Sequence, residues 1–201
     1  MGERQVFQPL TREDKITVVL YRIGIVLSTA LIAGLAFRMA RASSGPDMLC
    51  CDRPADILLY GLYASVGMSV FFIHLYIRKF HTYLKYLYIV GLGCLVALFN
   101  FGYGSLSGAL LEAPSRALLL LPLSGCLGFV TAKEAFCFQL VEGYVLAMVM
   151  PLYLLLVAGG FLSGTAASAG LTLIAAMLVL FTLRKVFMPI AYDIGDKSAY
   201  Q

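Results

Sequence analysis

The sequence predicts an all-α membrane protein built as a bundle of six transmembrane helices. Hydrophobic residues make up 61% of the chain, above the roughly 45–50% typical of soluble domains. Charged residues make up only 13%, about half of the usual fraction. A soluble core of this size could not bury so much apolar surface, so lipid must solvate most of the chain.

Six apolar stretches are each long enough to cross the roughly 30 Å of hydrocarbon in a bilayer. They must be helical, because backbone groups in lipid have to form hydrogen bonds within the segment. We expect one domain over residues 1–201, with an N-terminal tail of residues 1–15 and a C-terminal tail of residues 190–201. The expected spans cover residues 16–37, 56–77, 83–103, 117–132, 141–162 and 168–189.

Turn-forming residues separate most of these spans. Residues 42–54 and 102–114 are rich in Gly, Ser and Pro, and residues 163–165 read Ser-Gly-Thr. Residues 78–82 form so short a polar link that the second and third spans must be an antiparallel hairpin. The fourth break has no Pro-Gly signal, yet one helix over residues 117–162 would be more than twice the membrane thickness. Only polar residues 131–134, or Gln139 and Glu142, can interrupt the helix there.

The distribution of positive charge predicts the orientation. In a six-span chain, eleven of the fifteen lysines and arginines fall on the side of the two termini, including all the lysines. Lys and Arg near span ends are retained on the cytoplasmic side. We therefore expect both termini in the cytoplasm, or in the stroma if the membrane is a thylakoid.

Ionisable residues near the fourth break mark a candidate polar pocket. Within a helix, Glu134 and Cys137 lie three residues apart and Glu142 follows in steps of four, so the three share a face. Arg22 lies at a depth similar to that of Glu142, which makes a salt bridge geometrically possible, and Lys133 can extend toward the headgroups. Such groups cost about 2.5–3.5 kcal/mol each at the centre of a membrane helix. Three interpretations of these residues remain open: interfacial groups in water, a buried structural pair, and a substrate or proton site.

His74 and His81 are the only histidines and are weak ligand candidates. On one continuous helix they would lie about 10 Å apart, too far to share an ion, although a tight turn could bring them together. The cations Arg78 and Lys79 between them disfavour a further positive ion. We therefore expect no metal site and identify no cofactor.

The C-terminal tail carries charges of both signs around a glycine. Asp193, Asp196 and Lys197 are candidates for docking a partner, and a solvated tail is the alternative.

In the first loop, Cys50 and Cys51 are too close in sequence to form an unstrained disulfide with each other. Pairing with another chain and free thiols both remain open.

Three stretches of sequence resemble a known family. They are Lys-Glu-Ala-Phe-Cys-Phe at residues 133–138, Asp-Ile-Gly-Asp-Lys-Ser at residues 193–198 and His-Leu-Tyr at residues 74–76. Together they resemble a family of uncharacterised integral membrane proteins known chiefly from cyanobacteria and other oxygenic phototrophs. The resemblance implies a membrane of a phototroph and no particular activity. We expect a multi-pass protein of a plasma or thylakoid membrane.

Composition and motifs favour a non-catalytic role. The chain has no Walker loop, nucleophile elbow, zinc-protease motif or dinucleotide fingerprint. The net charge of +4 is spread along the chain, which excludes a basic patch for nucleic acid. We expect an accessory or scaffold protein of a larger complex in an energy-converting membrane. The alternatives are a small-molecule or ion transporter that uses Glu134 and Glu142, and a membrane redox protein.

Overall fold

The computed structural model describes residues 11–42, 53–75, 78–162, 164–189 and residue 193. Every regular element in this part of the chain is a helix, and six spans are long and apolar enough to cross a membrane. The all-helical, six-span prediction is therefore confirmed. In chain order the elements are α1 (Arg12–Ala42), α2 (Arg53–Phe72), α3 (Arg78–Phe101), α4 (Leu106–Glu112), the 3-10 helix η1 (Pro114–Leu120), α5 (Leu121–Phe138), α6 (Val141–Ala158) and α7 (Gly164–Val186).

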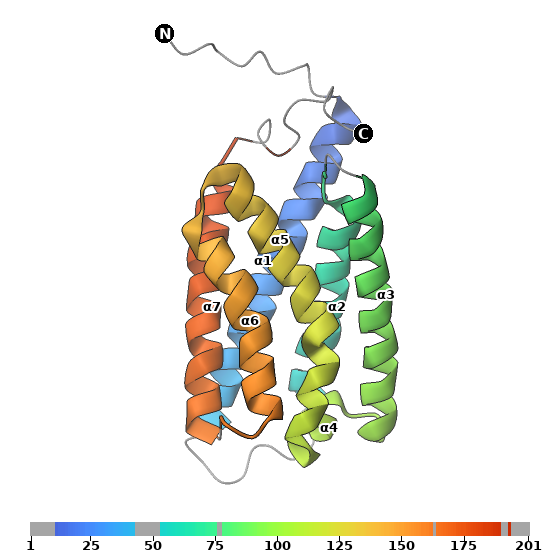
Figure 1. Cartoon of the computed structure of the whole chain (residues 1–201), viewed down its shortest axis with the longest axis vertical. Helices are drawn as coiled ribbons and strands as arrows, with labels where there is room; N and C mark the ends of the chain where they lie inside the picture. Colours follow the sequence, from blue (N-terminus) through green and yellow to red (C-terminus); the bar gives the residue numbers. More distant parts are fainter. Residues whose placement is uncertain (1–10, 43–52, 76–77, 163, 190–192, 194–201) are drawn as a thin grey trace.

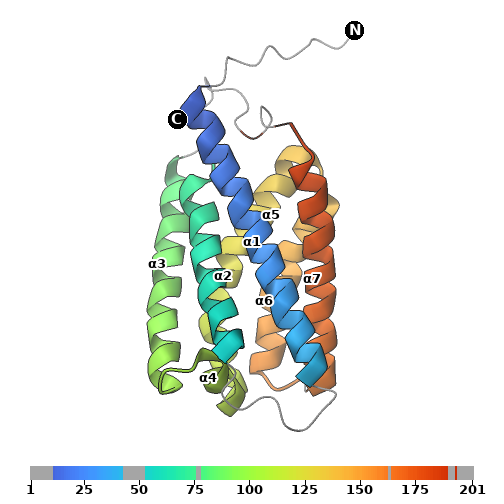
Figure 2. The same ribbon diagram turned by 180° about the vertical axis from the view of Figure 1, so that it is seen from behind.

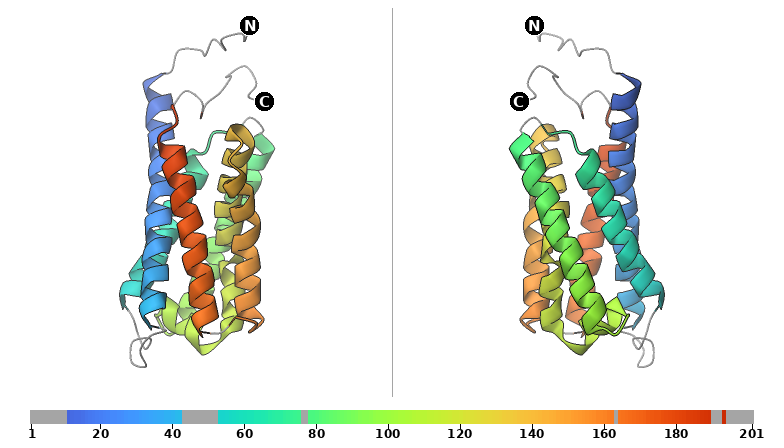
Figure 3. Two further views of the ribbon diagram at one scale, coloured as in Figure 1. Left: turned by 90° about the vertical axis from the view of Figure 1, so that its left-hand side faces the viewer. Right: turned by 90° about the vertical axis from the view of Figure 1, so that its right-hand side faces the viewer.

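The spanning helices form two layers. One layer contains α7, α1 and α2, with α1 crossing between its neighbours (Figure 2), and the other contains α6, α5 and α3 (Figure 1). Edge-on views show the two layers packed against each other (Figure 3). The start of α1, the α5–α6 turn and the end of α7 share one end of the bundle, here called the charged end. The opposite end, where α4 lies, is called the α4 end.

Small polar residues attach α1 to both of its neighbours. The hydroxyls of Ser28 and Ser65 lie 2.8 Å apart between α1 and α2. Those of Thr29 and Thr182 lie 2.7 Å apart between α1 and α7. At Gly24 a Cβ atom would meet the backbone of α2, so glycine allows the two helices to approach closely. Small residues and interhelical hydroxyl contacts are typical of helix packing in lipid, where apolar surface gains little by leaving the solvent.

The fourth break lies at Gln139. This residue adopts a left-handed conformation with φ of 55° and ends α5, and α6 begins two residues later. The helix is therefore interrupted at Gln139 and not at the earlier polar residues 131–134. Because α5 continues to Phe138, Lys133 and Glu134 lie within the helix and past its expected end at Ala132.

The third loop contains a helix that the sequence analysis did not anticipate. Ser105 caps the N-terminus of α4, and its side chain accepts a hydrogen bond from the Gly108 amide. The Ser107 amide donates to Asp56 Oδ1 at 2.7 Å, which ties α4 to the start of α2. The fourth span then begins as a 3-10 turn at Pro114, a residue suited to the first helical turn because it lacks an amide hydrogen.

Candidate functional site

The candidate site is a group of ionisable side chains buried at the charged end. Three helices and Asp193, which follows α7, contribute to it. We call it the ion-pair cluster; its members are Tyr21 and Arg22 of α1, Lys133 and Glu134 of α5, Lys185 of α7, and Asp193.

Glu134 accepts contacts from three elements. Tyr21 donates its hydroxyl to Oε1 at 2.7 Å, and Lys133 Nζ donates to the same oxygen at 2.8 Å. Lys185 Nζ forms an ion pair with the other oxygen, Oε2. The Glu134 side chain is completely buried, so these contacts replace the water that it would otherwise require.

Asp193 joins the end of the chain to this carboxylate. Its Oδ1 atom pairs with Lys185 Nζ, and its Oδ2 atom accepts a hydrogen bond from Arg22 Nε at 2.6 Å. Only 5% of Asp193 is exposed. Lys185 therefore lies between two carboxylates, one from α5 and one from beyond α7.

Arg22 also binds the backbone where α7 ends. Its NH1 group donates to the carbonyls of Val186 at 3.2 Å and Met188 at 2.7 Å, and NH2 donates to Pro189 O at 3.2 Å. The last carbonyls of a helix have no partner within the helix, and a cation there also interacts favourably with the helix dipole. A side chain of α1 thus fixes the path of the chain as it leaves α7.

The ion-pair cluster contains three cations and two carboxylates. Lys185 Nζ also lies 3.8 Å from the centre of the Phe138 ring, a cation–π contact that offsets part of its lost hydration. Each buried charge costs several kcal/mol in desolvation, and good geometry with further hydrogen bonds is needed to recover that cost. The arrangement is chemically suited to fix three helices and the C-terminal segment relative to one another.

The predicted polar pocket is only partly assembled. Arg22, Lys133 and Glu134 meet in the ion-pair cluster, whereas Cys137 is exposed. Glu142 instead pairs with Arg184 NH1 at 2.5 Å at the edge of the bundle. Arg22 pairs with Asp193, and not with Glu142, the partner that the sequence made geometrically possible. The reason is that the chain beyond α7 brings an aspartate next to α1.

Tyr21 and Lys185 belong to the site although the sequence did not predict them as members. Lys185 was counted only as a charge at a span end, although it continues the buried face of α7 that contains Phe181 and Leu178. That spacing of four and three residues is the signal that could have identified it. Asp193 was assigned to a docking tail, whereas the structure places it inside the bundle end.

Both histidines lie outside the ion-pair cluster. His74 follows α2, and its Nε2 atom lies 3.3 Å from Thr17 Oγ1 of α1. Burial, reinforced by the nearby Lys133 cation, lowers the pKa of His74 below its ordinary value. His81 lies in the first turns of α3, and its Nε2 atom is buried without a hydrogen-bond partner in the described structure.

Among the described residues, no three His, Cys, Asp or Glu side chains are placed to hold a metal ion. Several sequence predictions lie outside the described residues: the partner-docking residues Asp196 and Lys197, and the thiols of Cys50 and Cys51.

Comparison with known proteins identifies a family. A family model described as an uncharacterised integral membrane protein (DUF2301) matches residues 68–201. No curated protein and no solved structure matches the chain. The matched region contains Glu134, Lys185 and Asp193, whereas Tyr21 and Arg22 of α1 precede it.

Proposed function

The chain belongs to this family of uncharacterised integral membrane proteins, and we propose that it acts as a non-catalytic accessory protein. In this proposal, the bundle holds the C-terminal segment in a fixed position at the charged end, where it contacts a larger membrane complex. The positive charge at that end supports a cytoplasmic or stromal location for it.

One observation carries the proposal: Arg22 binds Asp193 and three backbone carbonyls at the end of α7. These contacts hold Pro189 and Asp193 against α1. A segment held in one conformation loses less conformational entropy on binding than a free tail does. Burial of Asp193 thus gives it an anchoring role, and leaves direct docking to Asp196 and Lys197.

The proposal is tested by purification from native membranes in a mild detergent. A stoichiometric partner should accompany the wild-type protein and be lost from Asp193→Asn, because the segment is then no longer held. Replacing Asp196 and Lys197 together should remove the partner without lowering the stability of the bundle. Glu142→Gln is the matched control, since it removes a carboxylate whose pairing with Arg184 lies outside the ion-pair cluster.

The proposal fails if the wild type has no stoichiometric partner, or if Asp193→Asn retains it in full. A folded Asp193→Asn protein is required for this comparison, and its thermal unfolding transition provides that check.

Transport is the second candidate function, and Glu134 is the observation that favours it. A buried carboxylate beside two lysines is a costly arrangement in a membrane helix, and such groups often mark ion or substrate paths. Solute flux into liposomes should then depend on Glu134 and also on Glu142. A wild-type flux that disappears in Glu134→Gln and Glu142→Gln would support transport, and the absence of flux in the wild type would contradict it.

A further inference from the structure

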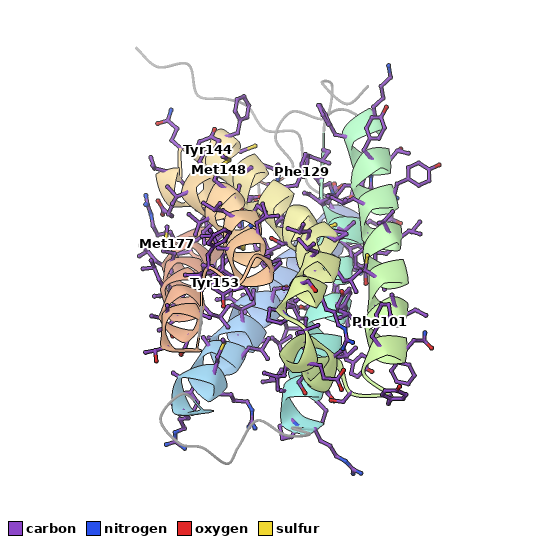
Figure 4. The ribbon with its side chains drawn as sticks, turned by 60° about the horizontal axis from the view of Figure 1, so that its bottom comes forward. Phe101, Phe129, Tyr144, Met148, Tyr153 and Met177 are labelled. Atoms are coloured by element: carbon purple, nitrogen blue, oxygen red, sulfur yellow. The ribbon has the colours of Figure 1, made fainter. Side chains whose placement is uncertain are left out.

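A large apolar cavity lies between the two helix layers, in the half of the bundle nearest the α4 end. Its volume is about 590 Å³. This lies within the roughly 300–1,000 Å³ range of sites that enclose small ligands. Leu59 of α2, Leu123 of α5 and Ile174 of α7 contribute to its walls. Figure 4 tilts this end forward and labels Tyr153 on α6, another wall residue.

The cavity extends through about one leaflet of a bilayer. Its lining runs from Ala55 to Val66 along α2, and from Gly164 to Ile174 along α7. At about 1.5 Å per residue these stretches correspond to about 15 Å, half of the roughly 30 Å hydrocarbon thickness. A ligand in the cavity would reach from the interface at the α4 end to the membrane centre.

Apolar residues separate the cavity from the ion-pair cluster. On α7, Ile174 lines the cavity, Lys185 lies in the cluster, and Leu178 and Phe181 between them are at most 1% exposed. On α5, the fully buried Val130 lies between the cavity and Glu134. A ligand in the cavity therefore meets a different set of polar groups from those of the cluster.

The polar groups on the cavity lining are few. Arg38 of α1 lines the cavity near the α4 end, and Ser107 of α4 lies on the same lining. Ser124 lines it deeper in the bundle, and its Oγ atom is buried with no hydrogen-bond partner in the described structure. Tyr153 contributes its ring, because its hydroxyl donates to Ala167 O at 2.9 Å. A ligand matched to this lining has a long apolar body and an anionic group at one end.

We infer that the cavity binds a single-chain anionic amphiphile of the fatty-acid type, with its carboxylate at Arg38 and its hydrocarbon chain extending toward the membrane centre. A guanidinium offers two parallel hydrogen bonds to a carboxylate, which a neutral headgroup cannot match. The depth and apolar walls suit one chain, and the volume excludes most of the bulk of a two-chain lipid.

Palmitate is the probe, and hexadecanol is its uncharged counterpart with an equal chain. Binding to the whole purified protein is measured by native mass spectrometry in a neutral detergent. We expect one palmitate per chain, bound about tenfold or more tightly than hexadecanol, because only the acid forms charge-assisted hydrogen bonds. Equal affinity for the two probes would overturn the role of Arg38.

Two pairs of variants locate the ligand. Arg38→Gln should weaken palmitate binding about tenfold and leave hexadecanol unchanged, and Arg41→Gln, on the same helix end but not on the lining, should affect neither. Ala117→Phe adds bulk inside the cavity and should reduce binding of both probes. Gly93→Leu is its control, because a side chain at Gly93 meets open space.

If Ala117→Phe does not fold, Ala167→Leu adds bulk at the α7 wall of the same cavity. Palmitate binding that is unchanged in a folded cavity-filling variant would overturn the proposal. Equal losses in Arg38→Gln and Arg41→Gln would also overturn it, because general surface charge would then explain the binding.

Discussion

Glu134 is the residue that connects most members of the ion-pair cluster. Its two oxygens contact groups from α1, α5 and α7, and the side chain is entirely buried. Loss of this negative charge would leave the positive charges of Lys133 and Lys185 poorly balanced in a region from which water is excluded. Removal of one partner from a buried ion pair is more harmful than removal of both, because the remaining charge is left unpaired.

We therefore predict that Glu134→Gln lowers the free energy of unfolding by about 3–5 kcal/mol. Reversible unfolding in mixed micelles measures the change. Glu112→Gln is the control, because Glu112 pairs with Arg116 while 58% of its side chain is exposed. Exposed pairs contribute below about 1 kcal/mol. Equal effects of the two substitutions would show that burial does not determine the contribution of Glu134.

His74 gives a prediction about pH. Its pKa is lowered in the folded protein by burial and by Lys133, so the unfolded chain takes up the proton first as the pH falls. Stability should therefore be unaffected well above pH 6.5 and should decrease as the pH falls below that value. The slope reaches at most about 1.4 kcal/mol per pH unit for a single group. The difference between wild type and His74→Gln across this range isolates the effect, and parallel profiles would contradict it.

Among the elements, α1 contacts both of its neighbours and contributes to the charged end. It lies between α2 and α7 and contributes both Tyr21 and Arg22 to the ion-pair cluster. Its contact with α2 depends on Gly24, where a Cβ atom would lie 2.8 Å from Ser65 O and 2.9 Å from Ser69 N. Those are backbone atoms, so the helices would have to move apart.

Gly24→Ala should destabilise the protein by about 1–3 kcal/mol, the usual cost of excess bulk at a closely packed position. Gly93→Ala provides the comparison, since nothing lies within 4 Å of the added atom. That change should be neutral or stabilising, because alanine favours helix by up to about 1 kcal/mol over glycine. Thermal unfolding of both variants measures the difference, and a neutral Gly24→Ala would contradict the close approach of α1 and α2.

The positions of the spans could be predicted from the sequence more fully than the contacts between them. Length and apolar composition are sufficient to identify a membrane helix, because lipid requires every backbone group to bond within it. The sequence located the fourth break only to within residues 131–142. The reason is that a glutamine in the left-handed conformation, such as Gln139, has no strong sequence signal. The short α4 helix was missed for a related reason: its few residues contain both Gly and Ser, which are also typical of loops.

The pairings in the ion-pair cluster depend on the rotation and tilt of helices, which composition does not determine. Lys133 and Glu134 were identified because ionisable groups at membrane depth are costly. The assignment of Asp193 to Arg22 and Lys185 required knowledge of how the chain turns after α7. Arg22 was placed at the correct end of the bundle, yet the partner considered for it was Glu142, which pairs with Arg184.

For the whole molecule, the six spans place the start of α1 and the end of α7 on the same side of the membrane. The positive charges predict that this side is the cytoplasm or stroma. Fluorescent-protein fusions at either terminus should be fluorescent in bacterial cells, and alkaline phosphatase inserted after Tyr103 should be active. Reporters that place the two termini in opposite compartments would contradict the arrangement.

The central claim is that Arg22 and Asp193 hold the C-terminal segment against the bundle, and a double-mutant cycle tests it most directly. Unfolding free energies are measured for the wild type, Arg22→Gln, Asp193→Asn and the double variant. We predict a coupling energy of about 1–3 kcal/mol, because each single substitution leaves the other group buried without its partner. Effects that add within about 0.5 kcal/mol would mean that the two side chains act independently, and the claim would be wrong.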